Sequence, residues 1–415
     1  MQNRMSELLH SFRYRNYLWL WLVVALTNTG KWVFTLAVTW QVYNLTHSSF
    51  WSGALMFASM FPNIIGAPVV GVLADKIERR RLIFIAVGIA LTVLLLLAGF
   101  TAAHLMNSGG MIVMALLFGL ATSTMGVSIN AIVPTLVPKD VLYNAYSLQA
   151  VGQRGTEFVG PFLAAPLLAA FGPESVYLFG AATYVVAIVF ALFLSVPNTV
   201  ERKVSEGFFA SLGNGFRYIH RNRYIFGIIV LVGLHCSLTM AFLGMLPKYV
   251  QQGLGAKSSF YGVLMSMVGL GSIFGTLFLA GVKSHALRMK LFWTSAVLSG
   301  LSLSFLGESS SNTVAVVAII LVGASQALFM TLTVAFVQEA TAEHVRGRVT
   351  SVYLVLAAGL MSLANWGYGW LANVVAPKYI MLTAGLLFTV VVGIYWLATR
   401  NKPLGKPVSN EMLEL

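Results

Sequence analysis

The chain has 415 residues, of which 58% are hydrophobic and only 9% are charged. Soluble domains carry about 25% charged residues, so this composition excludes an ordinary soluble protein. The single cysteine, Cys236, leaves no disulfide framework and no thiolate metal site. A formal net charge of +13 could suggest a nucleic-acid partner, but the positions of the charges argue otherwise.

Apolar runs of about 20 residues, long enough to span a bilayer as a helix, recur along almost the whole chain. Membrane barrel strands would instead alternate polar and apolar residues over about ten positions. The runs lie near 17–44, 51–74, 82–104, 110–133, 141–170, 175–196, 224–250, 258–282, 290–307, 313–337, 347–375 and 379–398. The sequence therefore predicts an all-α polytopic membrane protein with twelve transmembrane helices.

The basic residues are distributed unevenly among the segments that connect these runs. With both termini placed in the cytoplasm, 21 of the 26 Lys and Arg residues fall inside, and only Lys248, Lys257 and Lys378 fall outside. Short cytoplasmic loops carry an excess of Lys and Arg, so this bias predicts that both termini are cytoplasmic. The positive charge is thus a topology signal, and no nucleic-acid partner is needed to explain it.

The two halves of the chain repeat weakly, because a basic turn follows Gly71 in the first half and Gly281 in the second. Six apolar runs in each half indicate a parallel repeat about an axis along the membrane normal. This pattern predicts two pseudo-symmetric six-helix bundles, at 1–196 and 224–400, followed by a cytoplasmic tail at 401–415.

The bundles are joined by the connection 197–223, the longest and most polar of the internal ones. Phe208, Leu212, Phe216 and Ile219 recur within it at helical spacing, while neighbouring arginines can face lipid headgroups. The spacing predicts a short amphipathic helix on the inner membrane surface, with a flexible linker as the alternative.

The turn between the second and third runs resembles the signature of the major facilitator superfamily, G-x-L-a-D-[RK]-x-G-R-[RK]-x. The matching residues are Gly71, Leu73, Asp75, Lys76, Arg79 and Arg80, whereas Glu78 stands where the signature has glycine. Asp75 is suited to lie against the N-terminal dipole of a helix in the other half while it pairs with an arginine. We expect Gly71, Asp75, Lys76, Arg79 and Arg80 to form a gating contact that breaks when the halves rock.

A second resemblance covers most of the chain. Residues 40–48, Phe61-Pro62, residues 134–138, residues 144–148 and Gly160-Pro161 follow in an order similar to the macrolide-efflux and enterobactin-exporter branch of that superfamily. The resemblance implies a proton-driven exporter of a small amphiphilic molecule, in a bacterial cytoplasmic (inner) membrane. Gly160 and Pro161 also resemble a fifth-span motif of antiporters. Where this branch often carries an acid in the first span, the chain has Lys31, so a mechanism that depends on that acid does not transfer.

Three charged residues are expected deep in the membrane: Lys31, Arg154 and Glu157. An ionisable group at this depth costs at least about 2.5–3.5 kcal/mol, so it usually faces a cavity or a partner. Lys31 and Arg154 lie 14 and 13 residues into outward-running spans, so they reach similar depths. Arg154 and Glu157 are three residues apart and share a helical face.

Two interpretations of these charges stay open at this stage. In one, Glu157 binds a proton in one state and pairs with Lys31 or Arg154 in another, because burial disfavours the carboxylate and a nearby cation favours it. In the other, Arg154 and Glu157 form a permanent pair that only makes the span tolerable. The excess positive charge of Lys31 would also suit an anionic substrate.

Other intramembrane polar and aromatic groups are candidates to line a substrate cavity. They are Asn28, Phe34, Gln41, Asn63, Asn130, Gln153, His235, Gln326, Asn365 and Tyr368. For His235, a hydrogen-bonded histidine in the helix packing is the alternative to a titrating role.

The sequence holds no H-E-x-x-H and no phosphate-binding loop, and its histidines are scattered, so we predict neither an enzyme nor a nucleotide, metal or cofactor site. The expected partners are a small-molecule substrate, a proton as coupling ion and membrane lipids. The predicted function is proton-coupled export of a drug-like compound or a siderophore by alternating access. The alternatives are an importer or facilitator, a lysolipid flippase of the same fold, and a transporter-derived sensor.

Overall fold

The computed structural model describes residues 10–64, 77–196, 208–282 and 284–399, and every regular element in these ranges is helical. The basic turn's Gly71, Asp75 and Lys76 lie outside them, as do most of the connection before residue 208 and the tail. The first half of the chain contains η1 (His10–Arg13), α2 (Arg15–Thr46), α3 (Ser49–Met60), α5 (Arg79–Ala102), α6 (Ser108–Leu136), α7 (Leu142–Phe171) and α8 (Pro173–Leu192).

The second half contains two sets of elements. The longer helices are α9 (Phe208–Arg221), α10 (Arg223–Leu238), α12 (Ser258–Ala280), α13 (His285–Gly307), α14 (Asn312–Ala340), α15 (Arg346–Val374) and α16 (Pro377–Thr399). The short ones are α11 (Leu246–Lys248), η2 (Tyr249–Gly253) and η3 (Glu343–Val345). The predicted helix in the connection is thus present as α9.

Several helices begin where a side chain caps the free backbone amides. The Asn107 side chain accepts a hydrogen bond from the Gly110 amide before α6, and the Asn222 side chain accepts from the Tyr224 and Ile225 amides before α10. Ser284 and Ser311 do the same for α13 and α14. Proline opens α8 and α16, where its missing amide costs nothing.

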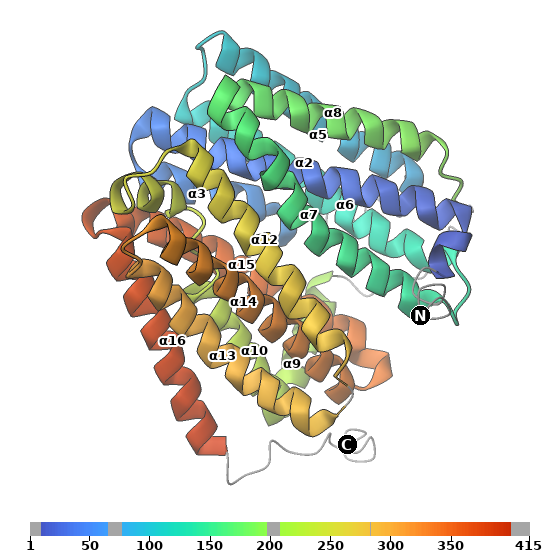
Figure 1. Cartoon of the computed structure of the whole chain (residues 1–415). Helices are drawn as coiled ribbons and strands as arrows, with labels where there is room; N and C mark the ends of the chain where they lie inside the picture. Colours follow the sequence, from blue (N-terminus) through green and yellow to red (C-terminus); the bar gives the residue numbers. More distant parts are fainter. Residues whose placement is uncertain (1–9, 65–76, 197–207, 283, 400–415) are drawn as a thin grey trace.

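The helices form two groups that follow the halves of the chain (Figure 1). In the first group, α2 packs against α6, α7 and α8, and α5 packs against α6 and α8. In the second, α13 packs against α14 and α16, α12 against α14, and α10 against α15. The two groups meet where α7 crosses α12 and where α3 crosses α15.

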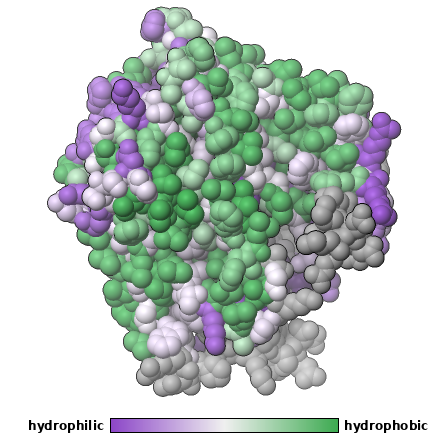
Figure 2. Space-filling view, in the orientation of Figure 1, coloured by the Kyte–Doolittle hydropathy of each residue, from purple (hydrophilic) through white to green (hydrophobic). Residues whose placement is uncertain are grey.

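Nine helices of the described part are long and apolar enough to cross a membrane, and α10 is a shorter apolar helix. Their outward faces carry exposed leucine, valine and phenylalanine side chains, among them Leu95, Phe278 and Leu387. Figure 2 shows hydrophobic side chains over most of one face of the molecule, with hydrophilic ones gathered mainly toward its edges. This distribution is that of a multi-pass membrane protein.

Glycines let the two groups approach backbone to backbone at both crossings. At the first crossing, a Cβ on Gly269 of α12 would collide with the backbone of Glu157 and Phe158 in α7. At the second, a Cβ on Gly53 of α3 would meet the Asn365 carbonyl oxygen and the Cα of Gly369, both in α15. Small residues at helix crossings are a means of close association in membranes.

The buried apolar core is continuous between the halves at one end only. One cluster joins Val33 and Phe34 of α2 to Tyr261 of α12 and Ile319 of α14. A separate cluster, which includes Phe292 and Phe336, lies wholly in the second half, around α10, α13, α14 and α15. The joined end carries the connections at 47–48, 254–257 and 375–376, which the charge distribution predicts to be outside, and we call it the outer end.

The predicted span 224–250 is not one continuous helix. Helix α10 ends at Leu238, and the chain turns before α11 and the π-helical η2. Gly244 lies in this break, where its amide donates to Asn365 Oδ1 at 3.1 Å and an added Cβ would stand 3.0 Å from the Gly53 Cα. The break thus lets the second half contact the first half closely at the outer end.

Candidate functional site

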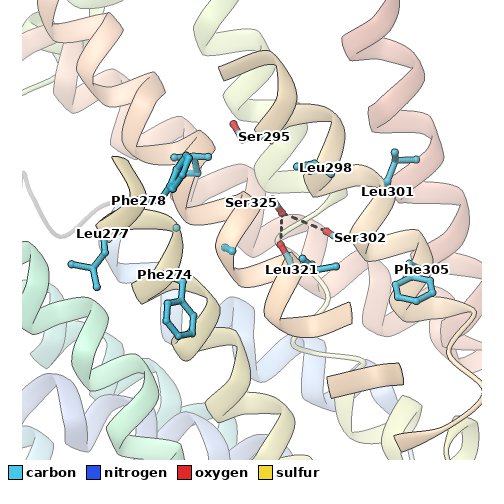
Figure 3. A pocket seen from close by; sticks show the side chains of 13 residues that line it. Phe274, Leu277, Phe278, Ser295, Leu298, Leu301, Ser302, Phe305, Leu321 and Ser325 are labelled. Carbon is cyan, nitrogen blue, oxygen red and sulfur yellow. Dashed lines mark hydrogen bonds between the residues drawn. The ribbon is translucent and has the colours of Figure 1, made fainter. Parts of the chain in front are cut away.

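Three hollows in the described residues differ in their chemistry. Two are apolar and measure about 700 Å³ each; one lies among α12, α13 and α14 (Figure 3), and the other lies among α9, α10 and α15. The third measures about 220 Å³ and is mostly polar. We call this third hollow the polar pocket, and Lys31 is the charged residue that lines it.

The polar pocket lies entirely within the first half of the chain. Its lining residues are Val24, Thr27, Asn28, Lys31, Asn63, Thr122, Met125, Gly126, Ile129, Asn130, Gln149 and Gln153. Five of the predicted cavity residues, namely Asn28, Lys31, Asn63, Asn130 and Gln153, are therefore brought together. The pocket also contains Thr27 of α2 and Thr122 of α6, which the sequence analysis did not propose. Each donates to a carbonyl of its own helix, as other threonines of the chain do.

Helical spacing explains how a few helices supply so many polar groups to one pocket. Asn28 and Lys31 are three residues apart on α2, and Gln149 and Gln153 are four residues apart on α7, so each pair shares a face. The Asn28 amide donates to the Val24 carbonyl at 3.0 Å, which orients its carbonyl oxygen away from its own helix. Gln149 is buried, and its Oε1 has no hydrogen-bond partner. A buried acceptor of this kind calls for a donor, which a ligand can supply.

An ion pair with a buried carboxylate and a guanidinium that is 34% exposed lies on α7 beside the pocket. The Arg154 Nη1 is 3.2 Å from the Glu157 Oε2, and the Glu157 side chain is only 11% exposed. The Lys31 ammonium is within electrostatic reach of this carboxylate. Two basic side chains thus share one acidic side chain, and the cluster formed by Lys31, Arg154 and Glu157 has a formal net charge of +1.

This cluster also faces the second half of the chain. Gly269 of α12 presses on the backbone of Glu157, and Arg154 is within electrostatic reach of the Tyr353 hydroxyl on α15. That hydroxyl is 2.8 Å from Thr333 Oγ1 of α14. Any displacement of α12 and α15 against α7 therefore changes the surroundings of the buried carboxylate.

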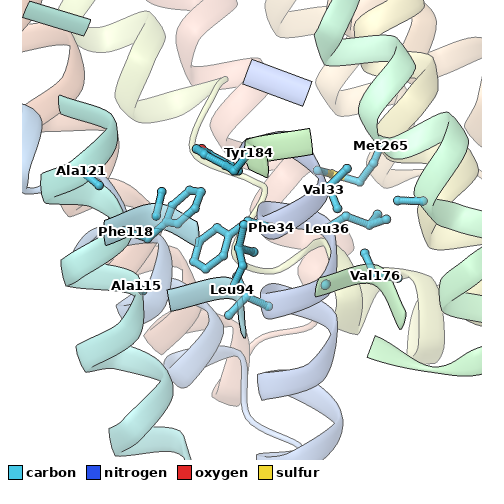
Figure 4. Close-up of a cluster of buried hydrophobic side chains, with 14 of the residues drawn as sticks. Val33, Phe34, Leu36, Leu94, Ala115, Phe118, Ala121, Val176, Tyr184 and Met265 are labelled. Atoms are coloured by element: carbon cyan, nitrogen blue, oxygen red, sulfur yellow. The ribbon is translucent and has the colours of Figure 1, made fainter. Parts of the chain in front are cut away.

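Two predicted cavity residues of the first half lie in its helix packing instead of the pocket. The Phe34 ring is buried and stacks on Phe118 with 4.0 Å between the centroids (Figure 4). Gln41 bridges helices: its Nε2 donates to Thr101 Oγ1 at 2.9 Å, and its Oε1 accepts from the Tyr177 hydroxyl at 2.6 Å.

The predicted cavity residues of the second half make helix-bridging contacts around the broken α10. His235 is fully buried, its Nε2 lies 2.9 Å from Ser299 Oγ, and its ring packs on Phe329. Gln326 donates to the Thr239 carbonyl at 2.8 Å, and the Tyr368 hydroxyl donates to the Leu238 carbonyl at 3.4 Å. Asn365 accepts from the Gly244 amide. The structure does not bring these four residues into the polar pocket.

The described residues of the predicted gating motif bind within the first half. Arg79 donates to the Ala131 carbonyl of α6 at 2.9 Å, and Arg80 donates to the Leu192 carbonyl of α8 at 2.9 Å. Leu192 is the last residue of α8, where the helix dipole favours a cation. Gly160 lets α7 approach α2 closely, since an added Cβ would stand 3.0 Å from the Thr29 carbonyl oxygen. Pro161 follows it as a buried residue inside α7.

Polar contacts close the outer end, and the sequence analysis did not find them. The hydroxyls of Thr39 and Tyr261 are 2.6 Å apart, and Gln251 donates to Asn44 Oδ1 at 2.6 Å. The Asn373 side chain accepts from the Ser49 amide and donates to Ser48 Oγ. Each contact joins the first half to the second. Only the polarity of residues near helix ends pointed to them, and polarity does not identify partners.

Together, the apolar helices, the two crossing groups and the polar pocket define a membrane transporter. The chain matches the transmembrane secretion effector family over residues 7–405, and it belongs to this family of the major facilitator superfamily. Its relatives are transporters and not enzymes, as the sequence predicted.

Several curated relatives align over most of the chain. It is 23% identical to the staphyloferrin A transporter of Staphylococcus aureus over 346 residues, which cover 81% of this chain and 84% of the relative. It is 23% identical to macrolide efflux protein A of Enterococcus faecalis, with 75% and 98% covered. It is 26% identical to the enterobactin exporter EntS of Escherichia coli, with 77% and 76% covered. These relatives confirm the predicted macrolide-efflux and enterobactin-exporter branch.

Solved structures share the fold. A variant of the nucleoside transporter NupG superposes with a TM-score of 0.74 at 15% identity, over 92% of this chain and 99% of that one. A POT family transporter in complex with 5-aminolevulinic acid gives a TM-score of 0.73 at 12% identity, over 94% and 97%. At such low identity, the likeness concerns the fold alone.

Proposed function

We propose that this protein exports a small amphiphilic molecule, a siderophore or a drug-like compound, in exchange for protons. The observation that carries the proposal is the juxtaposition of the polar pocket with the cluster of Lys31, Arg154 and the buried Glu157. Relatives in this family are transporters of a macrolide or a siderophore, and these substrates support the same class for this protein.

The pocket favours a ligand that has a compact polar or anionic group. Its volume of about 220 Å³ is smaller than the roughly 300–1,000 Å³ of pockets that enclose a whole drug-sized ligand. The polar group of the substrate occupies the pocket and faces Lys31 and the amides, while its larger apolar part extends toward the second half. The unpartnered Gln149 oxygen accepts a hydrogen bond from a substrate hydroxyl or amide.

Glu157 is the proton-binding group in this proposal. Arg154 and Lys31 lie in the same half as Glu157 and favour its ionised form, whereas burial of Glu157 against α12 favours the protonated form. Because α12 rests on the backbone of Glu157, the rocking of the halves and the protonation of this group are coupled.

Alternating access follows from the same architecture. Twelve helices in two pseudo-symmetric bundles, 1–196 and 224–400, rock about the crossings of α3 with α15 and α7 with α12. The linker 197–223 and the tail 401–415 lie in the cytoplasm of a bacterial cell, whose inner membrane holds the protein. The described contacts close the outer end, and the turn from Gly71 to Arg80 acts as the gate at the inner end.

The test uses everted membrane vesicles that hold a proton gradient and a pH-sensitive dye. A catecholate siderophore, a macrolide and a hydrophobic cation are added in turn to the native protein and to Glu157→Gln. The matched control is Glu174→Gln, which removes an acid from the first turn of α8 outside the cluster. We expect one compound to release protons with the native protein and with Glu174→Gln, and Glu157→Gln to abolish this release while it stays folded.

Two results would contradict the proposal in different ways. If Glu157→Gln released protons at the native rate, the assignment of Glu157 would be wrong. If none of the three compounds moved protons in native vesicles while one of them still accumulated down its own gradient, the protein would be an uncoupled carrier.

A further inference from the structure

We infer that the apolar groove among α9, α10 and α15 binds the acyl chain of an anionic phospholipid, whose headgroup is held by Arg217 and His220. Both residues line the groove, which measures about 700 Å³, together with Phe226, Gly233 and Leu360. This site is separate from the polar pocket, and no residue lines both.

The groove is a built feature, because one face of α9 is anchored against α15 and the loop before it. Gly215 lets α9 touch α15 closely, since an added Cβ would stand 2.9 Å from the Arg348 carbonyl oxygen. Ile219 is 3% exposed, and the Tyr218 hydroxyl accepts from the Ala342 amide at 3.3 Å. The neighbouring residues Phe216 and Arg217 stay exposed, so a second face of α9 forms a wall of the groove.

The dimensions of the groove match one chain of one leaflet. Along α10 the lining runs from Phe226 to Ser237, which is 11 residues or about 16 Å. Half of a hydrocarbon core of about 30 Å is about 15 Å. The groove therefore extends from the predicted cytoplasmic surface to about the middle of the bilayer.

The charges are placed at the headgroup end. His220 is in edge-to-face contact with Phe226, 5.9 Å between ring centroids, and Arg217 lies one turn before it on α9. The cytoplasmic leaflet is the one that carries anionic lipids, and a basic residue near its surface contributes about 1 kcal/mol of attraction. The groove thus pairs an apolar channel with the Arg217 guanidinium and the His220 imidazole at one end, as an anionic phospholipid requires.

The groove among α12, α13 and α14 provides an internal comparison. It has the same volume, but its polar lining groups are the hydroxyls of Ser295, Ser302 and Ser325, and its other lining residues are uncharged (Figure 3). Acyl chains can fill both grooves, but only the groove among α9, α10 and α15 selects a negative headgroup.

Native mass spectrometry of the full chain in detergent tests this inference. The protein is titrated with phosphatidylglycerol and with phosphatidylcholine that have the same acyl chains. We expect the first phosphatidylglycerol to bind at least fivefold more tightly, and Arg217→Gln to reduce this affinity about fivefold, which corresponds to about 1 kcal/mol. Arg217→Lys should retain the preference, as should Arg223→Gln, which removes a nearby charge that does not line the groove.

Filling each groove distinguishes the two sites. Val230→Trp should remove the tightly bound phosphatidylglycerol, whereas Leu298→Trp, in the comparison groove, should leave it bound. Equal retention of the two lipids by the native protein would overturn the inference, and so would an equal loss in Arg223→Gln and Arg217→Gln. Competition by soluble glycerol phosphate would identify a free phosphate as the ligand and would also overturn it.

Discussion

The crossing of α3 and α15 at Gly53 offers a direct way to perturb the closed outer end. A Cβ at this position would lie 2.5 Å from the Asn365 carbonyl oxygen, 3.0 Å from the Gly369 Cα and 3.1 Å from the Trp366 Cα. All three neighbours are backbone atoms of α15, so no side chain can rotate away. Gly53→Ala therefore forces the two helices apart or strains them.

The expected size of the effect follows from the cost of overpacking, which is about 1–3 kcal/mol. This cost raises the free energy of the conformation with a closed outer end and not that of the open one. The population of the closed conformation relative to the open one should therefore fall about 5- to 140-fold. Gly367→Ala is the matched control, because this glycine lies on the same helix α15 but has no atom within 4 Å of an added Cβ.

The assay measures distances between spin labels at two exposed positions of the outer loops, His104 in the first half and Ser310 in the second. Both are replaced by cysteine in a background in which the buried Cys236 is alanine. We expect a longer distance component to gain population in Gly53→Ala and the native distribution to persist in Gly367→Ala. Identical distributions in both variants would refute the argument that this crossing holds the outer end closed.

Two further predictions concern single side chains. Lys31→Gln should reduce transport of an anionic substrate at least tenfold and leave transport of a hydrophobic cation equal or faster, as measured by uptake into everted vesicles; an equal loss for both substrates would contradict a charge-selective role. His235→Ala should lower the free energy of unfolding by about 2–4 kcal/mol, because it removes a buried ring and its bond to Ser299. Thermal unfolding in detergent measures this loss, and an unchanged midpoint would show that the site tolerates the cavity.

The sequence predicts most of the helical segments because the lengths of the apolar runs and the positions of the basic turns are read directly from the order of the residues. It also groups Asn28 with Lys31, since residues three apart on one helix share a face. It cannot give the rotation of a helix about its axis, which decides that Phe34 enters the core while Lys31 opens into the pocket. Nor does it show that α10 ends at Leu238, and this break supplies the free backbone groups that several buried polar side chains satisfy.

The two interpretations of Arg154 and Glu157 differ in whether the position of the carboxylate matters. Exchanging the residues, Arg154→Glu with Glu157→Arg, keeps an oppositely charged pair three residues apart on α7. It moves the carboxylate about 4.5 Å along the helix, away from the contact with Gly269.

A pair that only offsets the cost of burial would survive the exchange, so proton release would persist. If Glu157 binds the transported proton, the exchanged protein should keep its native thermal stability within about 1 kcal/mol and lose proton release as Glu157→Gln does. Retained coupling in the exchanged protein would assign the pair a structural role. The exchange keeps both charges paired, so it avoids the cost of about 3–5 kcal/mol that follows when one partner of a buried pair is removed.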